Sequence, residues 1–322
     1  GTNEIGIRLP SALAGFFTGL MIFFFLRRYL KSNLAGIFAF LVLITINGYV
    51  NRHVTRTGDY DALLTLFTTG YCLLFFTWIE TNNRRYLYPF FLFVTLAVLT
   101  KSVAGLLIAP ALLIYAIYRR KLIPLLRSRE FYLGTAFFLL MVGGYYFLRE
   151  KMQPGYLDLV WRYELGGRYG KTLNIHSGPP EFYLMNLLKY RMGYWVLFVP
   201  LSLILSFTST DLRLKRIGAF STLCAVVYLF VVSGGQTKLE WYDAPAFPLL
   251  AITIAVGLLR IFSLTENSDR AKRWGALSFK IAFVLLVFLL PYYRICNKIS
   301  KSSEYSWESE FFKVSYLFRN AN

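Results

Sequence analysis

Residues 84–121 read RRYLYPFFLFVTLAVLTKSVAGLLIAPALLIYAIYRRK, and this stretch decides how the chain is organised. Basic residues stand at both ends, and the apolar part between them is too long for the ~20 residues of one transmembrane helix. Basic clusters mark the cytoplasmic side of a membrane protein, so both ends lie inside and the stretch crosses the membrane twice. The turn falls at Leu99 to Ser102. The sequence therefore predicts a helical hairpin with Lys101 at the outer surface, where its ammonium avoids the bilayer centre.

The composition of the whole chain is that of an integral membrane protein. Its 322 residues are 56% hydrophobic and 18% aromatic, and the mean hydropathy is +0.49. Such values lie outside the range of soluble domains. The predicted fold is an all-α polytopic bundle of about ten transmembrane helices, some of them short for a span. The apolar runs are residues 11–26, 34–50, 62–79, 87–100, 102–118, 131–148, 193–208, 218–234, 243–262 and 280–293.

The net charge of +18, from 35 Lys and Arg against 17 Asp and Glu, follows the membrane topology. Short basic clusters stand between alternate apolar runs, which places them in the cytoplasm. A nucleic-acid-binding function gains no support from charge distributed in this way. The clusters are Arg27, Arg28 and Lys31; Arg84 and Arg85; Arg119, Arg120, Lys121, Arg127 and Arg129; Arg213, Lys215 and Arg216; and Arg270, Lys272 and Arg273.

The same alternation collects the unusual polar residues on the outer face. It places Glu4 and Arg8, the His53–Asp61 loop, the segment from about 149 to 192, and Lys238–Asp243 on that side. A loop as long as the third of these is usually functional. Within it, Glu181 to Lys189 predicts an amphipathic helix on the membrane surface with Phe182, Met185 and Leu188 on one face.

Several families of function are not indicated. Cys72, Cys224 and Cys296 are far apart and odd in number, so they imply no disulfide framework. The sequence contains no P-loop, no Gly-rich dinucleotide turn, no GxSxG and no CxxC-type metal cluster. The missing P-loop argues against an ATP-driven pump.

Five motifs in a fixed order, each on the predicted outer side, resemble those of GT-C membrane glycosyltransferases. The most similar branch contains aminoarabinose transferase and relatives of the protein O-mannosyltransferases. The motifs are RLPSALAG (8–15), RTGDYDALLTLF (56–67), LTKSVAGLLIAP (99–110), ELGGRYGKTLNIHSGPPEFYL (164–184) and KLEWYDAPAFPLLA (238–251). This resemblance implies inverting transfer of a sugar from a polyprenyl-phosphate donor to a lipid (lipid A-like), protein or glycan acceptor. It also implies a bacterial inner membrane protein with its active site facing the periplasm.

The resemblance also bears on the ends of the chain. The sequence begins GTNEIGIRLP, a point that in relatives follows the first outer loop. We therefore expect residues 1–294 to be a GT-C module that lacks its first helix and the loop carrying the catalytic base, and to be inactive alone. Residues 295–322 are expected to begin a periplasmic tail or domain.

Asp61 is the candidate catalytic residue, because the second acidic position of the family falls on it. An Asp at the start of a helix can also be a simple cap, and Asp59, two residues away, must point in another direction. The resemblance implies donor-phosphate binding by Lys101, since cationic groups stabilise a phosphate leaving group. Arg56 is a further candidate, because its planar guanidinium suits two phosphate oxygens. Lys238, beside Tyr242, has the same predicted role. Snorkelling or headgroup contact is the simpler explanation for each of these basic residues, and His53 is interpreted as interfacial.

Two candidates lie in the long outer loop. Arg168 is a candidate for binding the donor phosphate, although a helical ion pair with Glu164 explains it equally well. His176 is a candidate ligand for a divalent metal ion, the one cofactor that the resemblance allows, and a single His makes no metal site by itself.

Two alternatives remain open at this stage. A transporter or flippase of polyprenyl-linked glycans would also have about ten spans, but it should show internal repeats and ionisable residues at mid-membrane, and neither is found. An enzyme similar to O-antigen ligases stays possible among the glycosyltransferases.

Overall fold

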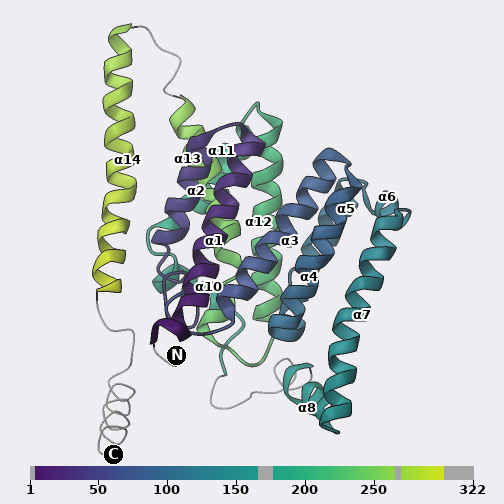
Figure 1. The fold of residues 1–322 in the computed structure, drawn as a ribbon. Coiled ribbons are helices and arrows are strands. Elements are labelled where there is room, and N and C mark those ends of the chain that lie inside the picture. The colour runs from purple at the N-terminus through teal and green to yellow at the C-terminus, as the bar shows by residue number, and fades with distance from the viewer. Residues whose placement is uncertain (1–3, 166–176, 265–269, 301–322) are drawn as a thin grey trace, which may run out of the picture.

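The computed structural model describes residues 4–165, 177–264 and 270–300, and helices run up and down through it as a bundle (Figure 1). In these residues the bridge between Ser177 and Thr237 is an isolated pairing outside any strand. The predicted all-α polytopic fold is confirmed.

The helices of the described residues have the following bounds. They are α1 (Glu4–Leu30), α2 (Asn33–Thr45), α3 (Asp61–Thr81), α4 (Leu87–Lys101), α5 (Ala109–Tyr118), α6 (Leu122–Leu126), α7 (Arg129–Met152), α8 (Tyr156–Val160), α10 (Phe182–Asn186), α11 (Trp195–Thr208), α12 (Leu212–Ser233), α13 (Ala246–Leu264) and α14 (Arg270–Ile299). Short 3₁₀ or π turns are η1 (Arg84–Tyr86), η2 (Ser102–Leu106), η3 (Trp161–Leu165), η4 (Leu187–Arg191) and η5 (Glu240–Asp243).

The number of full spans is smaller than the about ten expected from the apolar runs. Among the described residues, seven helices are long and apolar enough to cross a membrane, and the bent pair formed by Phe182–Arg191 and α11 can count as an eighth. The other two predicted runs form shorter helices. α2 stops after 13 residues, where Ile46 becomes extended. α5 has 10 residues because η2 occupies the chain that follows Lys101.

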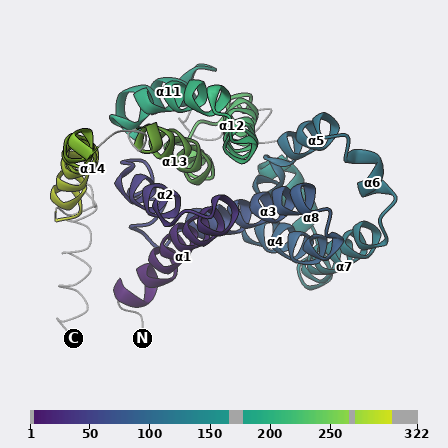
Figure 2. The same ribbon diagram turned by 90° about the horizontal axis from the view of Figure 1, so that it is seen from above.

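The helices α3 and α13 form the centre of the bundle. In each of them, 72% of the most apolar stretch is buried. α3 packs against α1 and α4, and α13 packs against α2, α11 and α12. α7 and α14 lie at opposite ends of the elongated array (Figure 2). Only 6% of the apolar stretch of α7 is buried. Its exposed Leu139, Leu140 and Phe147 are therefore suited to contact lipid.

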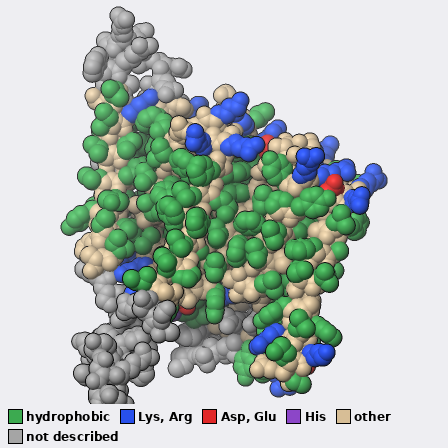
Figure 3. Space-filling view, viewed as in Figure 1, with side chains coloured by type: hydrophobic (Ala, Val, Ile, Leu, Met, Phe, Trp, Pro, Cys, Tyr) green, Lys and Arg blue, Asp and Glu red, His purple; other side chains and the backbone are tan. Residues whose placement is uncertain are grey.

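The two ends of the bundle differ in charge. Lys and Arg gather along one edge above a wide apolar zone (Figure 3). This edge contains the end of α1, the connection from α3 to α4, and α6 (Figure 1). The clusters that begin at Arg27, Arg84 and Arg119 thus share one end, as the positive-inside rule predicts. We call it the inner end and the opposite end the outer end.

A carboxylate ties four helices together at the inner end. Glu80 of α3 is 8% exposed and lies 3.0 Å from the Arg119 guanidinium, just after α5. Its other oxygen accepts from Arg216 of α12 at 2.9 Å and from the Tyr29 hydroxyl of α1 at 3.1 Å. Opposite charges compensate one another here, so the buried carboxylate is not left alone.

The predicted hairpin at Lys101 is confirmed. α4 ends at Lys101, η2 makes the turn, and α5 returns to the inner end. The turn is tight: Ser102 has a φ of 48°, and a Cβ on Gly105 would lie 2.6 Å from the backbone carbon of Ala97. The buried Tyr71 hydroxyl of α3 donates to the Gly105 carbonyl at 2.9 Å. These contacts fix where α4 stops and so where Lys101 stands.

The helix expected near the outer membrane surface is also present. α10 and η4 precede α11 and meet it at 108°. Met185 and Leu188 are exposed, as expected of a face turned to lipid, while Tyr183 and Leu187 are buried against the bundle. Residues 166–176 of this outer segment, with Arg168 and His176, lie outside the described residues, as do residues 301–322 of the expected tail. Residues 295–299 continue α14.

Replacing Gly105 with Ala should destabilise the protein by about 1–3 kcal/mol, because the added methyl group meets backbone that cannot rotate away. The midpoint of thermal unfolding in detergent measures this. Gly143→Ala is the matched control: nothing lies within 4 Å of its Cβ, and Ala in a helix should be neutral or stabilising. Equal midpoints for the two variants would contradict the packing described for η2.

Glu80→Gln should lower the same unfolding midpoint, with a loss of about 1–3 kcal/mol, because two guanidinium groups then lose their compensating charge. Glu181→Gln, at an exposed position, is the control and should leave the midpoint unchanged. If both variants unfold like the wild type, Glu80 does not hold the inner end together.

Candidate active site

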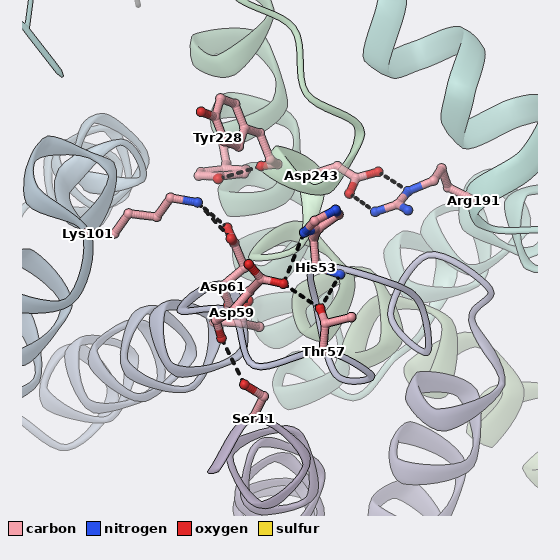
Figure 4. Close-up of polar contacts among 11 residues, drawn as sticks. Ser11, His53, Thr57, Asp59, Asp61, Lys101, Arg191, Tyr228 and Asp243 are labelled. Carbon is pink, nitrogen blue, oxygen red and sulfur yellow. Dashed lines mark hydrogen bonds and ion pairs between the residues drawn. The ribbon is translucent and has the colours of Figure 1, made fainter. Parts of the chain in front are cut away.

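Asp61 is the first residue of α3, but its side chain does not cap that helix. It is 4% exposed. Both carboxylate oxygens instead accept hydrogen bonds from the Lys101 ammonium, at 2.6 and 2.7 Å. The capping role that the sequence allowed is therefore not the one observed, and the structure brings together two of the predicted site residues from α3 and α4 (Figure 4).

Asp59 has a separate role. Its carboxylate lies 3.0 Å from His53 Nδ1 and accepts from the Thr57 hydroxyl. The His53 ring also stacks on Trp241, with centroids 3.9 Å apart. Asp59 and Asp61 turn to different partners (Figure 4), but Asp59 lies in the loop before α3 rather than on the helix that the spacing argument assumed. His53 joins two outer loops, beyond the interfacial role expected of it.

Aromatic side chains from several elements surround the ion pair. Lys101 Nζ lies 4.8 Å from the centroid of the Tyr242 ring, an arrangement that favours the cation. The Tyr146 hydroxyl of α7 donates to Ser102 Oγ at 3.0 Å. The Tyr228 hydroxyl of α12 donates to the Tyr242 carbonyl at 2.7 Å. Lys101 is therefore held by contacts from α3 and the η5 turn, and α7 binds the neighbouring Ser102.

A cavity of about 350 Å³ opens beside Asp61 and Lys101. Six tyrosines line it, together with the hydroxyl side chains of Thr100, Ser102 and Thr237 and the apolar side chains of Val98, Leu99 and Leu107. The tyrosines are Tyr60, Tyr145, Tyr146, Tyr156, Tyr228 and Tyr242. Such a lining offers hydroxyl groups, ring faces and apolar side chains, which suits an amphipathic ligand.

A second buried ion pair lies close by and was not predicted. Arg191 at the end of η4 donates to Asp243 of η5 at 2.8 and 2.5 Å (Figure 4). The side chains of Arg191 and Asp243 are 4% and 0% exposed. This bidentate pair fixes η5, and with it Tyr242, against the turn before α11. The two residues are 52 positions apart, so no sequence spacing indicated their contact.

The other predicted phosphate ligands lie differently. Tyr242 lines the cavity, whereas Arg56 donates to the Lys298 carbonyl at 3.3 Å. The Lys238 ammonium donates to the Ser233 carbonyl and lies 5.6 Å from the centroid of the Tyr183 ring. Burial lowers the pKa of Lys238. Neither Arg56 nor Lys238 lines the cavity.

The structure leaves the predicted metal ligand untested. His176 and Arg168 lie outside the described residues. Among the residues that are described, no three His, Cys, Asp or Glu side chains come together as a metal site.

Known proteins match this chain in both sequence and fold. Residues 1–146 match the model of the family described as dolichyl-phosphate-mannose-protein mannosyltransferase. An uncharacterized protein of Aquifex aeolicus (strain VF5) is 26% identical over 294 residues, which are 89% of this chain and 54% of that protein.

The fold is similar to that of ArnT from Cupriavidus metallidurans. The crystal structure of ArnT bound to undecaprenyl phosphate matches with a TM-score of 0.68 and 18% identity, over 92% of this chain and 59% of that one. The apo crystal structure matches with a TM-score of 0.65 and 17% identity, over 89% of this chain and 58% of that one. The chain thus spans a little more than half the length of the proteins it matches. The resemblance to GT-C glycosyltransferases is confirmed, because the chain has the GT-C fold of ArnT and its first 146 residues match the mannosyltransferase family model.

Proposed function

We propose that this chain forms the donor site of a glycosyltransferase that uses a polyprenyl-phosphate-linked sugar. The observation that carries the proposal is the Asp61–Lys101 ion pair in the wall of a tyrosine-lined cavity. A similar fold binds undecaprenyl phosphate in ArnT, and the family that matches residues 1–146 is described as using dolichyl-phosphate-mannose.

Lys101 is the residue that binds the donor phosphate. Its ammonium has three N–H groups, and Asp61 occupies it through two short contacts. A phosphate oxygen that enters the cavity can accept a hydrogen bond from the remaining N–H of the Lys101 ammonium. Negative charge grows on this phosphate as the bond to the anomeric carbon breaks, so a fixed ammonium stabilises the transition state more than the ground state.

Asp61 positions Lys101 and compensates its charge. Both of its oxygens already accept hydrogen bonds from that ammonium, so we assign it the positioning role. In the proposed inverting reaction an acceptor hydroxyl attacks the anomeric carbon, the electron pair of the broken bond stays on the phosphate oxygen, and the proton passes to a separate base. Asp61 is thus the second carboxylate of the site.

The cavity can take both parts of the donor. Tyrosine rings and hydroxyls suit the sugar, and Val98, Leu99 and Leu107 suit the first isoprene units. The helix ends that carry this site, the start of α3 and the end of α4, lie opposite the basic inner end (Figure 1). In a bacterial inner membrane this orientation faces the periplasm. There the acceptor would be a lipid, a protein or another glycan.

Asp61→Asn and Lys101→Gln should each reduce release of polyprenyl phosphate from a labelled donor by about 100-fold or more, because each removes a charge that acts on the leaving group. The full-length gene product, reconstituted in membranes, is assayed. Asp158→Asn is the matched control: Asp158 is an exposed carboxylate of α8 paired with Arg162, and its loss should leave the rate within about twofold, as for most exposed ion pairs.

Two outcomes would contradict the proposal. Folded Asp61→Asn and Lys101→Gln variants that retain the rate of the Asp158→Asn control would remove these residues from the reaction. A wild type that moves the donor across the bilayer and leaves it intact would favour the flippase alternative.

A further inference from the structure

Two neighbouring residues of η5, Tyr242 and Asp243, have partners in different places. The Tyr242 ring lines the cavity and lies over the Lys101 ammonium, with 4.8 Å between Nζ and the ring centroid. The Asp243 carboxylate accepts two hydrogen bonds from the Arg191 guanidinium (Figure 4). Neither Arg191 nor Asp243 lines the cavity. One short turn therefore connects a wall of the cavity to an ion pair outside it.

Arg191 is held firmly enough to act as an anchor for this turn. Its backbone carbonyl accepts from the Gly48 N–H at 2.7 Å, and its guanidinium lies 5.5 Å from the centroid of the Phe247 ring in α13. A Cβ on Gly48 would lie 2.3 Å from Phe247 Cζ and 2.9 Å from Arg191 Nε. The guanidinium is thus closely packed, and its planar fork fixes both oxygens of the Asp243 carboxylate.

The backbone of η5 passes this position on to the neighbouring tyrosine. The turn has four residues, and the Tyr242 N–H donates to the Leu239 carbonyl at 3.1 Å. The Tyr242 carbonyl accepts from the Tyr228 hydroxyl of α12 at 2.7 Å. Because Asp243 is covalently joined to Tyr242 in so short a turn, a displacement of its carboxylate also shifts the ring over Lys101.

The energetics of buried ion pairs favour positioning over stabilisation as the role of this pair. The side chains of Arg191 and Asp243 are 4% and 0% exposed, so both charges lose their hydration in the folded protein. The attraction between two such charges does little more than offset that cost, and apolar side chains in their place often give equal stability. What the pair does provide is one fixed geometry, and a shift of about 1 Å near a bound substrate can weaken its interactions strongly.

We propose that Arg191 and Asp243 are positioning residues of the donor site, which hold the Tyr242 ring over Lys101 through η5. This inference rests on the proposed function of the Lys101 cavity as the site of a polyprenyl-phosphate donor. Neither residue touches the donor. They set the affinity of the site for the phosphate, whereas the free energy of unfolding depends little on them as a pair.

The test measures binding of undecaprenyl phosphate to the full-length gene product in detergent, and the thermal unfolding midpoint without the lipid. The double variant Arg191→Met/Asp243→Leu replaces both charges with apolar side chains, and Leu keeps the branching of Asp. Its unfolding midpoint should stay close to that of the wild type. Its affinity for undecaprenyl phosphate should fall about fivefold or more, because the Tyr242 ring is no longer held over Lys101.

A double-mutant cycle tests whether the pair acts through the tyrosine. Tyr242→Leu removes the ring and should by itself weaken binding about fivefold or more. Added to Tyr242→Leu, the Arg191→Met/Asp243→Leu replacement should change the affinity by less than about twofold, because there is no ring left to position. Losses that simply multiply would contradict action through Tyr242.

Two further variants separate positioning from folding. Glu80→Gln removes a buried charge at the inner end and should bind undecaprenyl phosphate within about twofold of the wild type, although it unfolds at a lower temperature. Arg191→Lys keeps the charge and loses the planar fork. It should weaken binding about threefold, and it tests the proposal even where the double variant does not fold.

Failure of this inference differs from failure of the proposed function. Wild-type affinity in the folded Arg191→Met/Asp243→Leu variant, or in Arg191→Lys, would overturn the positioning role when Lys101→Gln still weakens binding. Equal affinity in the wild type and Lys101→Gln would contradict the proposed donor site, and the positioning role with it.

Discussion

The ion pair between Asp61 and Lys101 is the interaction on which the outer half of the structure depends. It joins the first residue of α3 to the last residue of α4, two helices that pack against each other. Placing an ammonium there requires α4 to stop at one residue. The positive φ of Ser102 and the close approach of Gly105 to Ala97 provide that stop.

Three buried carboxylates in the described part of the chain are each paired with a cation. Asp61 has Lys101, Asp243 has Arg191, and Glu80 has Arg119 and Arg216. A buried pair costs desolvation energy, and losing one partner costs more than the pair contributes. The ion pairs therefore add little to the free energy of unfolding. They do restrict how the helices that carry them can pack. They fix the ends of α3, the η5 turn and the start of α11 relative to one another, which an enzyme requires of the groups around its substrate.

Part of this organisation could be predicted from the sequence. The two basic clusters around residues 87–118 require a hairpin, and the apolar runs appear as helices in the structure. That Asp59 and Asp61 point in different directions was also predicted, although from a shared helix on which only Asp61 lies. Contacts between helices could not be predicted in this way, because periodicity describes one element at a time. Arg191–Asp243 and His53–Trp241 each join segments more than 50 residues apart.

The same limit explains the phosphate ligands. Sequence reasoning named Arg56, Lys101 and Lys238, with Lys101 as the strongest candidate, and of these three only Lys101 lines the cavity. Lys238 follows the end of α12, and its long side chain folds back to the Ser233 carbonyl. Arg56 meets α14, which comes from the other end of the chain. Tyr145, Tyr146 and Tyr156 gave no signal, since a membrane protein so rich in tyrosine carries many in its interfacial belts.

The most direct test of the central claim is a structure of the full-length gene product with bound polyprenyl phosphate. The account predicts that a phosphate oxygen lies within hydrogen-bonding distance of Lys101 Nζ, that Asp61 keeps at least one contact with that ammonium, and that the first isoprene units lie against Val98, Leu99 and Leu107. A phosphate bound elsewhere, with the Asp61–Lys101 pair unchanged and the tyrosine-lined cavity empty, would contradict it.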